Sequence, residues 1–366
     1  MIPFLDLKSS YLELKDQIDN LLHEVLSSGV YIGGDKVLHF ESEWAKYCLS
    51  AYSVGVASGL DALCLALQSL DIGQDDEVIV PSHTFIATWL SVSRVGAKPV
   101  PVDVNKDDYN IDTYQIEDAI TSKTKAILVV HLYGQPCNID HVRNIANAHN
   151  LYVIEDAAQA HGAEYKSSKI GSHSDVVAWS FYPGKNLGAF GDAGAITTNS
   201  MNIYNRIKSL QNYGSIKRYV HTEIGCNSRL DPLQAAILTC KLNFLDDWNK
   251  RRDNIAAIYS KKIINNHVLT PFVRDYSKSS WHLYVICLEN RAHFQEYMSN
   301  CGIQTLIHYP IPPYRQKAYS QGYKNTDFPV SSYISDRIVS LPIYPHLSIQ
   351  AANYIADVVS KYRPNI

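Results

Sequence analysis

Short apolar segments alternate with amphipathic ones from residue 52 onward, and this alternation limits the possible fold more than any other feature. The apolar segments have the length and composition of β-strands and lie at 52–57, 77–82, 98–104, 125–132, 151–156, 175–181 and 194–198. Helical patterns fill the intervals at 58–70, 84–96, 112–120 and 140–149. Strands that alternate with helices predict a mostly parallel sheet covered on both faces. We therefore expect the α/β fold class.

The remaining sequence predicts further helices and a second, smaller unit. Helical patterns occupy 11–27, 200–213, 231–247, 291–300 and 349–361, and a strand is expected near 281–288. A chain of 366 residues is longer than one ordinary core supports. We expect a large α/β domain over residues 1–247, which includes the N-terminal helix, and a small α+β domain over residues 248–366.

Composition and charge exclude several classes of protein. Hydrophobic residues make up 46% of the chain and charged residues 19%, as in a packed globular protein. The net charge is −3 and the basic residues are scattered, so we expect no nucleic-acid partner. The absence of an 18-residue apolar run argues against a membrane span. The seven cysteines form no C-x-x-C pair and no H-E-x-x-H motif occurs, so neither a metal site nor disulfides are expected. Free thiols and an N-terminus unlike a signal peptide favour the cytoplasm.

Ligands of open parallel sheets bind beyond the carboxyl ends of the strands, and several strand ends here carry suggestive residues. The first strand leads into Ser58-Gly59-Leu60 at a helix start, which suits an anion; a simple Ser N-cap is the alternative. The fifth strand ends in Asp156, whose carboxylate would either hold a pyridinium nitrogen protonated or cap the next helix. Phe85 follows the second strand and suits stacking on a flat ring, although a core position is the commoner role of such a residue.

A lysine in a loop of small residues is a further chemical signal. The strand over 175–181 leads into SFYPGKNLG, which contains Ser180 and Lys185. Partial desolvation in such a loop favours the neutral, nucleophilic amine that Schiff-base chemistry needs; an ordinary surface lysine is the alternative. Ser180 could donate to the same phosphate as the helix start at Ser58. Asn186 stands where a P-loop has Ser or Thr, and the glycines after it do not form G-x-G-x-x-G, so neither nucleotide fingerprint is present.

Six motifs in a fixed order carry a family resemblance over nearly the whole chain, from PFLDL at 3–7 to LPIYPHLS at 341–348. They are ASGLDAL, PSHTFIAT, VIEDAAQAHGAEY, SFYPGKNLGAFGDAGAITT, GCNSRLDPLQAAIL and IHYPIPPY. The chain resembles the DegT-type nucleotide-sugar aminotransferases, most of all those that aminate 3-keto-6-deoxyhexoses. The resemblance implies the aspartate aminotransferase architecture (fold type I), a mostly parallel seven-stranded sheet, and pyridoxal 5′-phosphate (PLP) as cofactor. Leu60 and Ala193 stand where many relatives have Thr and Gly, which leaves the phosphate to backbone N–H groups at Leu60.

The resemblance also implies roles for individual residues. Lys185 would be the Schiff-base lysine, and Asp156 would pair with the pyridine nitrogen. The other implied cofactor contacts are Ser58, Gly59, Leu60 and Ser180 at the phosphate, Phe85 on the ring, Gln159 near the ring hydroxyl, and Asn227 reaching the phosphate of the neighbouring subunit. The implied substrate contacts are Tyr182, Arg229, His308 and Tyr309.

The implied reaction moves an amino group from glutamate to a 3-keto-6-deoxyhexose carried by thymidine diphosphate, in a homodimer with shared active sites. The implied context is biosynthesis of deoxy amino sugars for lipopolysaccharide or S-layer glycans. Because Lys185 is retained, the relatives that carry His there and act as dehydratases are disfavoured. Amination at C4 of a 4-keto sugar and a non-catalytic PLP-binding sensor stay open as alternatives.

Overall fold

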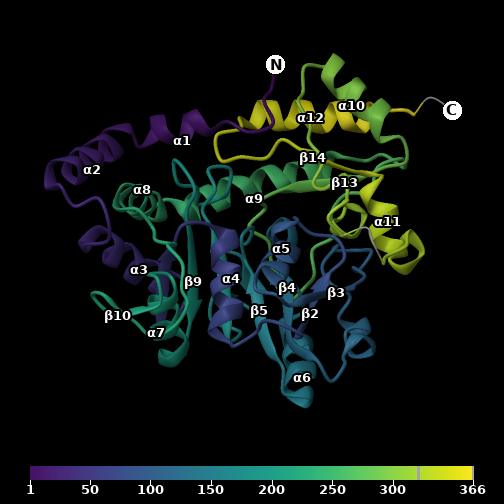
Figure 1. Ribbon diagram of the computed structural model, residues 1–366. Helices are drawn as coiled ribbons and strands as arrows, with labels where there is room; N and C mark the ends of the chain where they lie inside the picture. The colour runs from purple at the N-terminus through teal and green to yellow at the C-terminus, as the bar shows by residue number, and fades with distance from the viewer. Residues whose placement is uncertain (320–321, 365–366) are drawn as a thin grey trace.

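The computed structural model describes residues 1–319 and 322–364, and these residues form a seven-stranded central sheet (Figure 1). Across the sheet the strands are β1 (Tyr52–Val56), β9 (Gly194–Thr198), β8 (Val176–Ser180), β5 (Tyr152–Asp156), β4 (Thr124–Val130), β2 (Glu77–Pro81) and β3 (Lys98–Val102). β9 runs antiparallel to β1 and β8, and the other neighbouring strands are parallel. The predicted α/β class with a mostly parallel sheet is confirmed.

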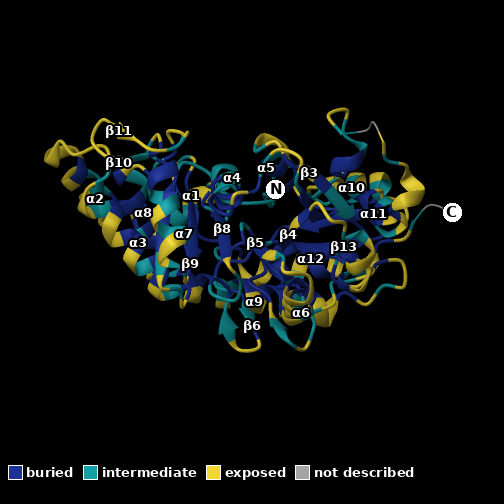
Figure 2. Cartoon of the chain, turned by 60° about the horizontal axis from the view of Figure 1, so that its bottom comes forward, coloured by how far each residue is buried: buried dark blue, intermediate teal, exposed yellow. Residues whose placement is uncertain are grey.

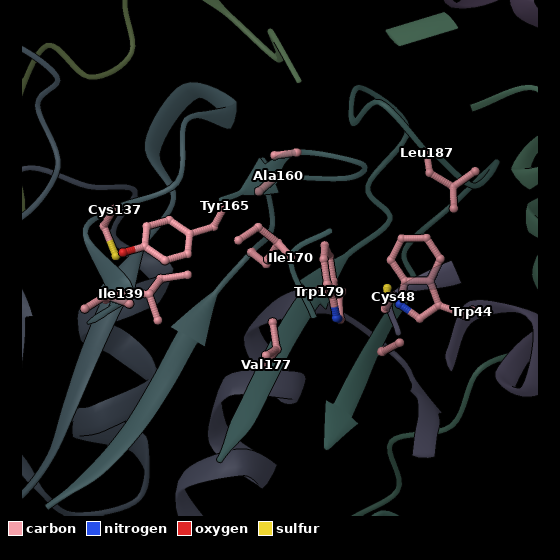
Figure 3. Close-up of a cluster of buried hydrophobic side chains, with 14 of the residues drawn as sticks. Trp44, Cys48, Cys137, Ile139, Ala160, Tyr165, Ile170, Val177, Trp179 and Leu187 are labelled. Carbon is pink, nitrogen blue, oxygen red and sulfur yellow. The ribbon is translucent and has the colours of Figure 1, made fainter. Parts of the chain in front are cut away.

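Helices cover both faces of this sheet. One face carries α4 (Gly59–Ser69), α5 (Ala87–Arg94) and α7 (Met201–Leu210), and the other carries α3 (Asp35–Tyr47), α6 (Ile139–His149) and α8 (Pro232–Leu242). Each face of the sheet has its own hydrophobic core, and successive residues of a strand belong to these two cores in alternation. Ile127 belongs to one core and Leu128 to the other. In Figure 3, Trp44 of α3 lies beside Trp179 of β8, and their ring centroids are 4.9 Å apart. Figure 2 shows the central strands as buried.

The N-terminal part differs from the prediction. The helix expected over 11–27 is divided into α1 (Leu7–Glu13) and α2 (Lys15–Ser28), because Leu14 between them has non-helical angles (φ −115°, ψ 15°). Leu14 is buried in a small cluster with Trp248, which fixes this bend. The segment 112–120, predicted as one helix, forms two short 3-10 turns instead.

The C-terminal part has its own core around a two-stranded antiparallel sheet. Its strands are β13 (Tyr284–Cys287) and β14 (Ile338–Leu341), and its helices are α9 (Leu245–Lys262), α10 (Arg291–Asn300), α11 (Pro329–Ser335) and α12 (Ile349–Lys361). The helices expected at 291–300 and 349–361 and the strand expected near 281–288 are confirmed. The expected domain boundary at 247/248 falls inside α9, so that division stays a prediction.

Short strands complete the fold at the surface. They are β6 (Glu164–Tyr165), β7 (Ser168–Lys169) and β12 (Ser277–Lys278) in one small sheet, and β10 (Ser215–Lys217) and β11 (Val220–His221) in another. Within the described part of the chain, no helix has both the length and the apolar character needed to cross a membrane.

Candidate active site

A cavity of about 1230 Å³ lies beyond the carboxyl ends of the central strands. Its walls come from both parts of the chain, because residues after β1, β2, β5 and β8 face residues from α9, α10 and the segment 303–309. Most of the predicted site residues line it: Ser58, Gly59, Leu60, Phe85, Asp156, Gln159, Ser180, Tyr182, Lys185, His308 and Tyr309. The parallel sheet therefore brings together groups that are up to 251 positions apart in the sequence, from Ser58 to Tyr309.

One corner of the cavity is formed by the start of α4 and the end of β8. Ser58 is the N-cap of α4, and its Oγ accepts a hydrogen bond from Asp61 N–H at 3.1 Å, so the simple capping role is present. An ideal Cβ on Gly59 would lie 2.5 Å from the Cβ of Ser180, so only glycine allows this approach. The helix start leaves N–H groups and a positive dipole end beside the Ser180 hydroxyl. This corner suits a phosphate group.

Asp156 lies at the end of β5, with a side chain only 7% exposed. Its Oδ1 accepts from Ala158 N–H at 3.2 Å, and its Oδ2 accepts from Thr88 Oγ1 at 3.0 Å. Burial raises the pKa of Asp156, and the two hydrogen bonds and the Lys185 charge act in the opposite direction. A carboxylate held in this way stabilises a cationic group, or a proton bound to a ring nitrogen, that contacts its oxygens.

Lys185 lies in the loop that follows β8, on the same cavity wall. Burial lowers its pKa to about 8, and the charge of Asp156 partly opposes this shift. The loop folds back tightly, since a Cβ on Gly188 would lie 2.3 Å from the carbonyl oxygen of Pro183. A much larger fraction of the amine than in an exposed lysine is therefore neutral near physiological pH, as a nucleophilic lysine requires.

The opposite wall carries two residues of the IHYP motif. Tyr309 Oη accepts from Gln159 Nε2 at 3.0 Å, and the Tyr309 ring centroid lies 5.4 Å from that of Phe85. Tyr133 N–H donates to Gln159 Oε1 at 2.6 Å, and Tyr133 Oη donates to the carbonyl oxygen of His308. Burial and the nearby Lys185 charge lower the pKa of His308 to about 4, so this ring is neutral. These contacts tie the strand ends to the C-terminal part of the chain.

Two predicted site residues lie outside this cavity. Asn227 is exposed and forms an isolated β-bridge with Asn212. Arg229 Nη1 donates to Asn212 Oδ1 at 3.1 Å, and its guanidinium lies 5.7 Å from the Tyr213 ring centroid. Within the described chain they do not line the cavity that Lys185 lines, so their expected contacts would require a neighbouring subunit.

Several residues that line the cavity or support its lining were not predicted from the sequence. Thr88 and Tyr133 hold Asp156 and Gln159, and Arg252 and His282 form part of the wall. Thr88 lies within the PSHTFIAT motif, which could have signalled it. His282 and Arg252 come from the C-terminal part, and nothing in their local sequence shows that they face Lys185.

This fold and this site define an α/β transferase of the aspartate aminotransferase type. An aspartate ends one strand, a lysine follows the neighbouring strand, and a helix start suited to an anion lines the same cavity. The chain belongs to the DegT/DnrJ/EryC1/StrS aminotransferase family, whose sequence profile matches residues 13–360. The predicted family membership and fold type are confirmed.

Curated relatives and solved structures agree with this assignment. The chain is 50% identical to dTDP-3-amino-3,6-dideoxy-alpha-D-galactopyranose transaminase of Aneurinibacillus thermoaerophilus, with 99% of each chain covered. It is 49% identical to the erythromycin biosynthesis sensory transduction protein EryC1 of Saccharopolyspora erythraea, with 97% of each covered. The crystal structure of S. venezuelae DesV in complex with a ketimine intermediate matches with a TM-score of 0.97 at 45% identity, with 98% of each covered.

Proposed function

We propose that this aminotransferase uses PLP to move an amino group from glutamate to a dTDP-linked 3-keto-6-deoxyhexose, giving a 3-amino-3,6-dideoxy sugar nucleotide. The observation that carries the proposal is that Lys185, with its lowered pKa, and the buried Asp156 line one cavity next to an anion-binding corner. The transaminase name of the relative from A. thermoaerophilus supports the sugar class.

The residues present fit PLP. Gly59 lacks the side chain that would close the corner against Ser180, so Ser180 and the N–H groups at Gly59 and Leu60 can converge on a phosphate, with Ser58 as their cap. Asp156 would face the pyridine nitrogen, and Phe85 would lie against the ring. Gln159 Nε2 has a second proton beyond the one given to Tyr309, and this proton suits the ring hydroxyl.

The chemistry of the chain follows from these positions. PLP, when bound, supplies the electron sink that lets a proton leave the carbon next to the amine. The neutral Lys185 amine is the nucleophile, and once released it accepts and returns that proton as general base and acid. Asp156, whose carboxylate is fixed by Thr88 and Ala158, would hold a proton at the ring nitrogen of the cofactor. Tyr182, His308 and Tyr309 would contact the sugar on the open side of the cavity.

We propose that the site is shared across a homodimer. The hairpin of β10 and β11 and the loop after it expose large apolar side chains, with Ile224 95% and Tyr219 81% exposed. Patches of this kind mark interfaces. Asn227 and Arg229 follow this segment, so a partner covering it would receive Asn227 at its phosphate corner and Arg229 near its substrate. The seven free cysteines fit the reducing cytoplasm as the place of reaction.

The experiment is an assay with glutamate and a small panel of nucleotide-linked 3-keto and 4-keto 6-deoxy sugars, with product regiochemistry read by NMR. Amination at C3 of the dTDP sugar is expected, and amination at C4 would overturn the proposed regiochemistry. Borohydride reduction followed by mass spectrometry should place a pyridoxyl adduct on Lys185. Lys185→Ala should lose both adduct and turnover, while exposed Lys106→Ala, the matched control, should keep both. An adduct without turnover on any sugar would favour a sensor.

A further inference from the structure

His282, just before β13, lines the same cavity as Lys185. Its Nδ1 lies 3.2 Å from Oδ1 of Asn186, the residue that follows Lys185 in the chain. Asn186 is 4% exposed and also contacts Asn249 of α9 and the backbone of Ser280. His282 is thus the cavity end of a series of hydrogen-bonded amides that includes the residue next to the lysine.

Two backbone carbonyls determine which group is the donor in each hydrogen bond of this series of amides. A carbonyl oxygen only accepts, so Asn249 Nδ2 donates to the oxygen of His161 at 2.8 Å. For the same reason Asn186 Nδ2 donates to the oxygen of Ser280 at 2.7 Å, and it also donates to Asn249 Oδ1 at 2.9 Å. Asn186 Oδ1 is therefore an acceptor, and the proton between Asn186 and His282 belongs to Nδ1 of His282.

Two glycines allow close packing around these hydrogen-bonded amides. Gly162 has a φ of +76°, and a Cβ there would lie 2.5 Å from Nδ2 of Asn249. Gly134 has a φ of +99°, and a Cβ there would lie 2.9 Å from the backbone nitrogen of His282. The amide chain and the backbone of His282 are packed too closely to rearrange freely, so the tautomer of His282 is set by the fold.

The second ring nitrogen of His282 is free to accept. Burial, and then the charges of Lys185 and Arg252, lower the pKa of His282 well below its ordinary value; His308 and His161 face it as well. The ring is neutral, and because Nδ1 holds the proton, Nε2 carries a lone pair. Residues 1–319 and 322–364 provide no hydrogen-bond partner for Nε2. The His282 ring is partly exposed and lines the cavity, so Nε2 is available to a donor on the Lys185 side.

We propose that Nε2 of His282 accepts a hydrogen bond from the Lys185 amine whenever that amine is free, which makes His282 a positioning residue for the lysine that moves the proton. This inference rests on the proposed function, in which the amino donor displaces Lys185. A released lysine side chain has many rotamers, and proton transfer needs one of them. The His282 ring lines the same cavity as Lys185 and is held by Asn186, the next residue in the chain. After burial, the charge of Lys185 has the largest effect on the pKa of His282.

The first test is NMR of the full-length protein labelled with ¹⁵N-histidine, both with pyridoxamine phosphate and without cofactor, since Lys185 is free in both forms. The expected result is the Nδ1–H tautomer for His282, with a Nε2 resonance that shifts in Lys185→Ala and not in Lys106→Ala. An Nε2–H tautomer would overturn the proposal, as would a Nε2 resonance that does not respond to Lys185→Ala. This readout does not depend on turnover, so it stands even if no keto sugar is aminated.

The second test compares two variants of His282 that distinguish the role of Nδ1 from the role of Nε2. His282→Asn keeps an amide N–H for Asn186 and removes the acceptor at Nε2, whereas His282→Gln extends an acceptor to that position. We expect His282→Asn to lower kcat about 10- to 100-fold, because a misplaced proton-transfer group is costly.

The same variant should change both KM values less than about threefold and should increase the isotope effect with α-deuterated glutamate. His282→Gln should recover part of the loss. Exposed His267→Asn is the matched control and should behave as wild type. An unchanged kcat in His282→Asn, or a lower kcat with an unchanged isotope effect, would overturn the proposal.

Discussion

Gly59 and Ser180 approach closely at the start of α4, and this approach allows a quantitative test of the phosphate corner. In Gly59→Ala the new Cβ would lie 2.5 Å from Ser180 Cβ and 3.1 Å from its Cα. Carbon atoms rest at about 3.5–4.0 Å, so the overlap is about 1 Å. Since Ser180 Cα belongs to β8, the side chain cannot rotate away, and the helix start must move instead.

A shift of this size separates the donors that converge on the phosphate. Loss of one hydrogen bond to a charged group costs about 1.5–3 kcal/mol, which corresponds to an increase of about 10- to 150-fold in the Kd for PLP. Gly184→Ala is the matched control, because it lines the same cavity and its Cβ would meet nothing closer than Leu5 Cδ2 at 3.5 Å. Its Kd should stay within about twofold of wild type, because 3.5 Å is an ordinary contact distance.

The assay is a titration of cofactor-free wild type and both variants with PLP, followed by tryptophan fluorescence, together with thermal unfolding without cofactor. Alanine in a helix is favoured over glycine by about 0.5–1 kcal/mol, so Gly59→Ala should remain folded while it loses affinity. Equal Kd values for Gly59→Ala and wild type would refute the reasoning. Equal losses in both variants would show that the site tolerates no added methyl group, and the specific role of Gly59 would fail.

The ionisable side chains of Lys185, Asp156 and Asp103 lead to three more expected outcomes. Because burial lowers the pKa of Lys185 to about 8, its acylation rate in the cofactor-free protein should rise as pH increases through about 8; a midpoint near the ordinary lysine value of about 10.4 would contradict this. Asp156→Asn should keep PLP but lower kcat about 10²- to 10³-fold, because the charge facing the ring nitrogen is lost; unchanged kinetics would count against that role. Asp103→Ala should lower the unfolding free energy in denaturant by about 2–6 kcal/mol, since the partly buried N–H of Val330 and the buried N–H of Ser331 lose their acceptor; a loss under about 1 kcal/mol would be evidence for a replacement partner.

The central sheet and its strand-end residues could be predicted because local signals determine them. A strand buried on both faces must be apolar along its length, so runs such as AILVV in β4 are visible without knowledge of their neighbours. Parallel strands then place their carboxyl ends at one edge, so Asp156 and Lys185 are expected in one site from the strand order alone. The family resemblance, which rests on the order of the motifs, then predicted roles for individual residues.

The other cavity wall could not be predicted, because it depends on which distant segments meet. His282 faces Lys185 only because α9 leads the chain back across the strand ends and β13 starts there. The bend at Leu14 has a similar cause: the helical periodicity continues through it, but burial of Leu14 beside Trp248 decides the local angles. Tertiary packing overrides helix propensity in such places.

The charges of the cavity explain why these distant groups belong together. The start of α4 and Arg252 are positive at two separate points, and Asp156 is the buried negative group in the same cavity. Burial lowers the pKa of Arg252 only to about 9, so it stays charged at neutral pH while backbone carbonyls of Trp281 and Ile343 hold its Nη1. A ligand that neutralises this arrangement must carry several anionic groups around one cationic centre. A phosphorylated pyridinium cofactor together with a dicarboxylic amino acid or a nucleotide diphosphate meets that requirement, whereas a neutral sugar alone would leave the start of α4 and Arg252 without an anionic partner.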